Sequence, residues 1–110
     1  MNSNIDEKYM RRCLQLAANG RFGAPPNPMG GAVVVCDGRI IGEGYHMHCG
    51  GPHAEANAIT KVAKSANNCD GSTLYITAAP CIECSKLIIQ AGIKRVVYCE
   101  EYRSEEGLDL

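Results

Sequence analysis

Two short motifs limit the folds open to this chain, because together they hold three side chains that can bind one metal ion. The first motif is His53-Ala54-Glu55, and the second is Cys81-Ile82-Glu83-Cys84, which directly follows Pro80. One imidazole and two thiolates form a three-ligand zinc set, and zinc with three protein ligands keeps a fourth position for water. The fold must therefore bring two segments that are distant in sequence to one point in space.

The hydrophobic pattern predicts helices and strands in alternation. We expect helices over about 5–19, 53–65 and 81–91 and strands over 32–36, 39–45, 74–77 and 95–99, with a further helix beginning near the end of the sequence. Asn19-Gly20 is typical of a C-terminal helix cap, and Asp37-Gly38 is a strong hairpin signal. Gly42 and Gly44 indicate a bulge in the second strand.

This order of elements predicts a mixed sheet with helices on its faces. The strand over 74–77 and the strand over 95–99 are joined by a helix, so we expect them to lie parallel with a right-handed crossover. Cys81 and Cys84 stand three residues apart at the start of that helix, which puts both sulfurs on one helix face where the dipole favours thiolates. His53 also stands at a helix start, and it reaches the same point if the two helices pack side by side.

Length and charge narrow the class of partner. The 110 residues are expected to form a single domain over residues 1–110. Charged residues make up 21% of the chain and nearly cancel to a net charge of -1, and no basic stripe suited to a phosphate backbone is present. We therefore expect a small-molecule substrate and no long nucleic acid as partner.

Cysteine usage and hydropathy bear on location. The seven cysteines are odd in number and scattered, and no signal peptide opens the sequence, which favours a reducing cytoplasm over a secreted disulfide scaffold. No apolar run approaches the roughly 20 residues that a membrane helix needs, so we expect no membrane partner.

The metal motifs also have simpler interpretations, which the residues alone leave open. A Cys-x-x-Cys pair at a helix start also describes a thioredoxin-like redox pair. A structural zinc site with four protein ligands would recruit Cys49, His46, His48 or another cysteine. Glu55 taken alone could be an acid at a helix N-terminus, stabilised by the helix dipole.

Other polar residues near the motifs have more than one possible role. His46, His48 and Cys49 could contact a substrate, bind a second metal or line a polar rim. Asn27 lies between two prolines in a segment that cannot continue a helix, so it could form a turn or present its amide to a sugar or a base. The other cysteines are expected to fill small apolar positions: Cys13, Cys36, Cys69 and Cys99.

With these motifs, the chain resembles the cytidine and deoxycytidylate deaminase superfamily over essentially its whole length. The front half, from Pro26-Asn27-Pro28-Met29-Gly30-Gly31 to Gly51-Pro52-His53-Ala54-Glu55, is similar to the deaminase domain of the riboflavin-pathway enzyme that acts on a diaminopyrimidine ribotide. The back half, through Pro80-Cys81-Ile82-Glu83-Cys84 to Gln90-Ala91-Gly92-Ile93-Lys94, resembles deoxycytidylate deaminase.

The resemblance implies an α/β fold, the three-layer α/β/α cytidine-deaminase-like sandwich with a mixed sheet. It also implies a Zn²⁺ ion held by His53, Cys81 and Cys84, with Glu55 as the residue that moves protons between the water, the ring and the departing amine. The substrate contacts that it implies are Asn27, Ala54 and His46. A homo-oligomer is the expected assembly.

We therefore predict a zinc-dependent hydrolase that removes the exocyclic amine of a free pyrimidine nucleotide and releases ammonia, with a deoxycytidylate-like substrate. The first alternative is the riboflavin-pathway deaminase of diaminohydroxyphosphoribosylaminopyrimidine. A second is a deaminase of adenosine or cytosine in nucleic acid. A non-enzyme alternative is a zinc-stabilised binding module.

Overall fold

The computed structural model describes residues 3–19, 30–45, 54–77, 82–98 and 103–106. The helices in these ranges are α1 (Ser3–Asn19), α2 (Ala54–Ala63) and α3 (Ile82–Gln90). The strands are β1 (Gly31–Cys36), β2 (Arg39–Tyr45), β3 (Thr73–Ile76), β4 (Arg95–Tyr98) and β5 (Arg103–Glu106). They form one sheet in the order β2-β1-β3-β4-β5, in which β3 and β4 are parallel and the other neighbours are antiparallel.

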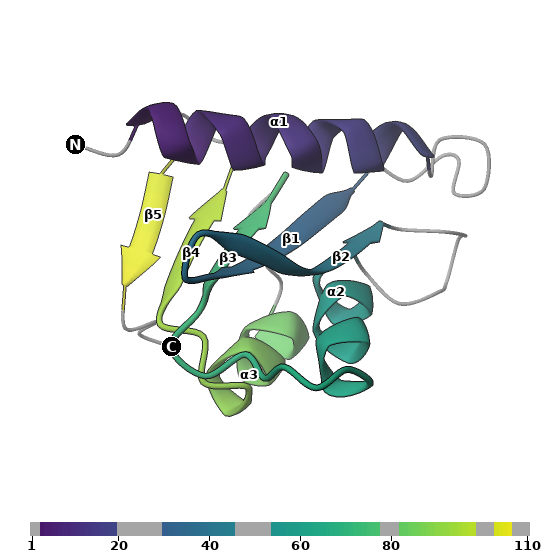
Figure 1. Cartoon of the computed structure of the whole chain (residues 1–110), viewed down its shortest axis with the longest axis vertical. Helices are drawn as coiled ribbons and strands as arrows, with labels where there is room; N and C mark the ends of the chain where they lie inside the picture. The colour runs from purple at the N-terminus through teal and green to yellow at the C-terminus, as the bar shows by residue number, and fades with distance from the viewer. Residues whose placement is uncertain (1–2, 20–29, 46–53, 78–81, 99–102, 107–110) are drawn as a thin grey trace.

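Helices cover both faces of this sheet, with α1 on one side and α2 and α3 on the other (Figure 1). The core side chains of β1 alternate between the two sides. Val33 and Val35 pack in the cluster that includes α1, while Ala32 and Val34 pack in the cluster that includes α2 and α3. The predicted three-layer sandwich with a mixed sheet is confirmed, and burial on both faces explains why β1 is apolar at every position from Ala32 to Val35.

The hairpin between β1 and β2 follows its sequence signal. Asp37 and Gly38 have φ angles of 52° and 75°, and positive φ at both central residues is the geometry of a type I′ turn. The pairing then shifts register, since Val34 lies opposite Gly42 and Val35 lies opposite Ile40. The predicted bulge is therefore confirmed, with one extra residue on β2.

The last described strand corrects one prediction. We expected the end of the sequence to begin a helix, but Arg103–Glu106 is β5 and pairs with β4 in antiparallel register from Arg95↔Glu106 to Tyr98↔Arg103. The pairing gives β4 backbone partners on the side away from β3, and an unpaired strand edge would lack them. The hydrophobic pattern of the segment alone carries no sign of that partner.

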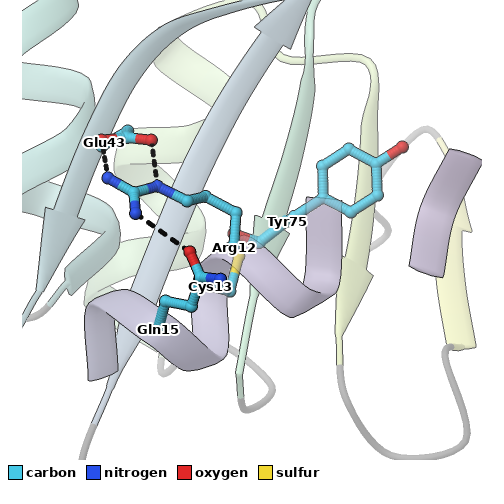
Figure 2. A network of polar contacts seen from close by, with 5 residues as sticks. All are labelled: Arg12, Cys13, Gln15, Glu43 and Tyr75. Carbon is cyan, nitrogen blue, oxygen red and sulfur yellow. Dashed lines mark hydrogen bonds and ion pairs between the residues drawn. The ribbon is translucent and has the colours of Figure 1, made fainter. Parts of the chain in front are cut away.

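Two charged contacts join α1 to the sheet. Arg12 donates to both carboxylate oxygens of Glu43 on β2, at 2.6 and 2.9 Å, and also to Gln15 Oε1 at 3.1 Å (Figure 2). The hydrogen bonds from Arg12 lower the pKa of Glu43. A two-point contact of this kind fixes orientation as well as distance, so α1 cannot rotate freely over the sheet.

The second contact lies near the start of α1. Asp6 accepts a hydrogen bond of 2.7 Å from the Tyr75 hydroxyl and two from Arg95, at 3.2 and 2.9 Å. Burial opposes ionisation of Asp6, but the hydrogen bonds from Arg95 and Tyr75 outweigh it and lower the Asp6 pKa. Burial and the contact with Asp6 raise the pKa of Tyr75. None of the described helices is long and apolar enough to cross a membrane.

Candidate metal and substrate site

The two strands that precede the metal motifs in the chain, β2 and β3, end on the same side of the sheet. Tyr45, the last residue of β2, pairs with Gly31, and Ala32 pairs with Ile76, the last residue of β3. Both β2 and β3 therefore end at the edge where β1 begins. Since α2 follows β2 and α3 follows β3 in the chain, both helices begin from this same edge.

Two glycines let α2 lie directly on β2. A Cβ atom at Gly44 would lie 2.5 Å from both the Ala54 carbonyl oxygen and the Ala58 nitrogen. At Gly42 it would lie 2.4 Å from a methyl carbon of Val62. The start of α2 thus faces the end of β2 at a separation that only glycine permits, and this close approach sets the position of Ala54.

A side-chain hydrogen bond also joins the start of α2 to the end of β2. Asn57 Nδ2 donates to the Tyr45 carbonyl oxygen at 2.7 Å, from the first turns of α2 to the last residue of β2. Residues 46–53 connect those two elements, so Asn57 holds both ends of that connection together. Sequence reasoning missed this residue, although asparagine is unfavourable inside a helix unless its side chain has a local backbone partner.

α2 and α3 pack against each other on one face of the sheet and share a core cluster that includes Ala58, Ile59 and Ile88. Ala54, the first residue of α2, is only 4% exposed and belongs to the same cluster. Cys84 lies in the first turn of α3 and is 7% exposed. The structure therefore places one predicted ligand and one predicted substrate contact at the buried starts of two packed helices.

The remaining predicted site residues are only partly covered by the structure. Glu55 is the second residue of α2. The other predicted positions lie outside the described residues: Asn27, His46, His48, Cys49, His53 and Cys81. Two of the three expected zinc ligands are among these, and within the described ranges no group of three or more His, Cys, Asp or Glu side chains could hold a metal.

The described part of the site fits a zinc ion by its donor chemistry. Cys84 offers a sulfur at a helix start, where the dipole favours the thiolate form that binds metal. His53 and Cys81 directly precede the first residues of α2 and α3 in the chain. Zinc accepts this combination of one nitrogen and two sulfurs.

The site can now be compared with known proteins. The sequence matches the family model described as the cytidine and deoxycytidylate deaminase zinc-binding region, over residues 3–100. The chain belongs to that deaminase family. The predicted superfamily, its zinc ion and its hydrolase class are thereby confirmed at the level of the family.

Two relatives come from riboflavin biosynthesis. The chain is 46% identical over 98 residues to the riboflavin biosynthesis protein RibD of Escherichia coli, which covers 84% of this chain and 26% of that protein. The crystal structure of a diaminohydroxyphosphoribosylaminopyrimidine deaminase/5-amino-6-(5-phosphoribosylamino)uracil reductase from Thermotoga maritima superposes with a TM-score of 0.86 at 44% identity, over 89% of this chain and 30% of that one. The deaminase chain spans about a quarter to a third of these relatives.

A third similar protein is named for a different nucleotide. The dCMP deaminase of cyanophage S-TIM5, crystallised with dCMP and dUMP, superposes with a TM-score of 0.79 at 35% identity, over 89% of this chain and 82% of that one. The fold of this deaminase family is therefore shared between proteins named for different pyrimidine nucleotides.

Proposed function

We propose that this chain is a zinc-dependent deaminase of the riboflavin pathway, acting on diaminohydroxyphosphoribosylaminopyrimidine. One observation carries the proposal: the helix starts that hold Ala54 and Cys84 lie buried at one sheet edge, in a chain that is 46% identical to RibD. The relatives favour this alternative over the deoxycytidylate-like substrate that we predicted first.

In this proposal His53, Cys81 and Cys84 hold the zinc ion. The position of Cys84 supports this role, since its side chain is buried at the start of α3, a helix that packs against the helix that His53 precedes. Zinc bound there would act as a Lewis acid that makes a water molecule nucleophilic at neutral pH.

Glu55 is the proposed proton carrier. Its position in α2 precedes Ile59 and Val62 by four and seven residues, and both of those side chains are buried. Positions with this spacing share one stripe of a helix, and this register in α2 supports the proposal. Its carboxylate would take one proton from the attacking water and pass it to the ring nitrogen. It would then take the second proton from the hydroxyl added to the ring carbon and pass it to the departing amine, which leaves as ammonia while a carbonyl remains.

The start of α2, Asn27 and His46 are the proposed substrate contacts. Ala54 is the first residue of α2, and the first amides of a helix have no acceptor within the helix. The Ala54 N–H is therefore suited to a hydrogen bond with an acceptor on the ring. Asn27 and His46 are proposed to contact the rest of the nucleotide, on the resemblance alone.

The proposal is tested by ammonia release from the purified, zinc-loaded protein. The diaminopyrimidine ribotide and deoxycytidylate are offered separately, to the native protein, to Glu55→Gln, and to Glu7→Gln as a control at an exposed acid on α1. We expect release from the ribotide with the native and Glu7→Gln proteins, and nearly none with Glu55→Gln although it keeps zinc. Equal release by Glu55→Gln would contradict the role of Glu55.

Deoxycytidylate is the second candidate substrate. It is supported by the similarity to the cyanophage dCMP deaminase that was crystallised with dCMP and dUMP. Ammonia release from deoxycytidylate alone would favour it. Bound zinc without ammonia release from either nucleotide would favour the binding-module alternative. Three further expectations stay predictions: the homo-oligomer, the cytoplasmic location and the single domain over residues 1–110.

A further inference from the structure

Thr77 makes an unusual connection where β3 leaves the sheet. Its main-chain N–H donates to the Gly31 carbonyl oxygen at 3.1 Å, and its side-chain Oγ1 accepts a hydrogen bond from the Gly31 N–H at 3.2 Å. In an antiparallel pair, opposite residues commonly exchange two main-chain hydrogen bonds. Here the Thr77 hydroxyl replaces its own carbonyl as the acceptor, so Gly31 keeps both bonds while the chain turns away towards α3.

Gly31 is held from its other side as well. A Cβ atom at this position would lie 2.0 Å from the Cys13 carbonyl oxygen and 2.9 Å from the Ala17 nitrogen. The start of β1 is therefore pressed against the backbone of α1, and Thr77 is bonded to a point that packing already fixes. Because Gly31 is fixed in this way, its hydrogen bonds also limit the movement of the Thr77 backbone.

In the sequence, Gly31 and Thr77 each lie close to a segment of the proposed site. Gly31 follows Asn27 by four positions, and Thr77 precedes Cys81 by four positions. Whatever fixes Gly31 relative to Thr77 also fixes where the substrate-contacting and metal-binding segments leave the sheet. The side-chain hydrogen bond is the part of this connection that a single substitution can remove without changing the strand pairing.

We propose that Thr77 is a positioning residue for substrate binding, which acts through the Gly31 N–H on the start of β1, the strand that the segment of Asn27 precedes. The inference rests on the proposed function. It differs from a general structural role, because loss of the hydroxyl should weaken nucleotide binding and leave the chemical step and the zinc ion in place.

The test uses the full chain loaded with zinc and the variant Thr77→Val, which keeps the branched shape and the main-chain N–H. Thr77→Ser keeps the hydroxyl and should behave as the native protein. Thr73→Val is a matched control at the other end of β3. We expect Thr77→Val to raise KM for the ribotide about tenfold with kcat changed less than about twofold, because only binding is weakened. Zinc content should be unchanged.

A double-mutant cycle makes the inference specific. If Thr77 acts through the segment of Asn27, then Thr77→Val should raise KM much less in an Asn27→Ala background than in the native one. Full additivity of the two effects would overturn the inference, as would an unchanged KM in Thr77→Val or a failure of Thr77→Ser to restore it. Lower zinc content in Thr77→Val would also overturn it.

Nucleotide binding separates this inference from the proposed function. The dissociation constants of the ribotide and of deoxycytidylate are measured by calorimetry in the Glu55→Gln background, with and without Thr77→Val. If a nucleotide binds in this background but the protein with native Glu55 releases no ammonia from it, the proposed function is refuted, and the change in dissociation constant caused by Thr77→Val still tests the role of Thr77. A protein that binds neither nucleotide would overturn both.

Discussion

Replacing Gly44 by alanine should disturb the helix start that carries Ala54 and Glu55 of the proposed site. The added Cβ would lie 2.5 Å from the Ala54 carbonyl oxygen and from the Ala58 nitrogen, and 2.8 Å from the Asn57 Cβ. Two of these three atoms are helix backbone, so no side-chain rotation relieves the contact. Ordinary contact begins at 3.4 Å, so α2 must move away from β2 by about 0.9 Å.

The size of the effect follows from that displacement. Forcing an extra carbon into a packed interior costs about 2 kcal/mol, which for a chain of this length lowers Tm by roughly 8 °C. A misplacement of about 1 Å at a catalytic group can lower the rate about 100-fold. We therefore expect Gly44→Ala to lower both Tm and kcat/KM by about these amounts.

Thermal unfolding and steady-state ammonia release measure the two effects. Thr60→Ala, at an exposed position of α2, is the control and should change stability by less than about 0.5 kcal/mol. If Gly44→Ala melted within about 2 °C of the native protein, the argument from close helix packing would be refuted. A native kcat/KM in a destabilised Gly44→Ala would instead refute the link between this junction and the site.

Three further substitutions test other parts of the structure. Asp6→Asn should lower the free energy of unfolding by about 2 kcal/mol at pH 7, since Arg95 loses a charged partner. Because the pKa of Asp6 is lowered in the folded state, the stability difference between native and variant protein is complete above the unfolded pKa of about 3.9. That difference fades as pH falls through the lower folded pKa. A difference in chemical denaturation that did not shrink in acid would contradict this. Cys84→Ala should lower zinc content measured by metal analysis, and undiminished zinc would remove Cys84 from the ligand set. Met10→Ala, at a fully buried side chain, should cost about 2 to 5 kcal/mol in urea unfolding, whereas a loss below about 1 kcal/mol would contradict its place in the core.

Local patterns were sufficient to predict most of the fold. The helices and the first four strands were predicted to within a few residues, because their apolar spacing and turn residues such as Asp37-Gly38 act locally. β5 was not predicted, because a short strand at a sheet edge depends on a partner distant in sequence. The charged contacts of α1 depend in the same way on tertiary structure: Arg12 and Glu43 are 31 residues apart.

The candidate site was also predicted where local motifs determine position and missed where tertiary contacts do. Ala54 and Cys84 were placed correctly at helix starts by motif and spacing. Asn57 and Thr77 were missed, because their partners are main-chain atoms of other elements that no sequence motif reveals. The motifs also did not decide the substrate, since the predicted metal ligands and the predicted proton carrier would serve any substrate of the family, and other contacts must distinguish one pyrimidine nucleotide from another.

The most direct test of the central claim is the origin of the oxygen in the product. The zinc-loaded protein is given the diaminopyrimidine ribotide in ¹⁸O-labelled water, and the product is examined by mass spectrometry beside the ammonia released. Hydrolytic deamination predicts one labelled carbonyl oxygen for each ammonia molecule. Ammonia without label in the pyrimidine, or no conversion of the ribotide by a protein that holds zinc, would contradict the account.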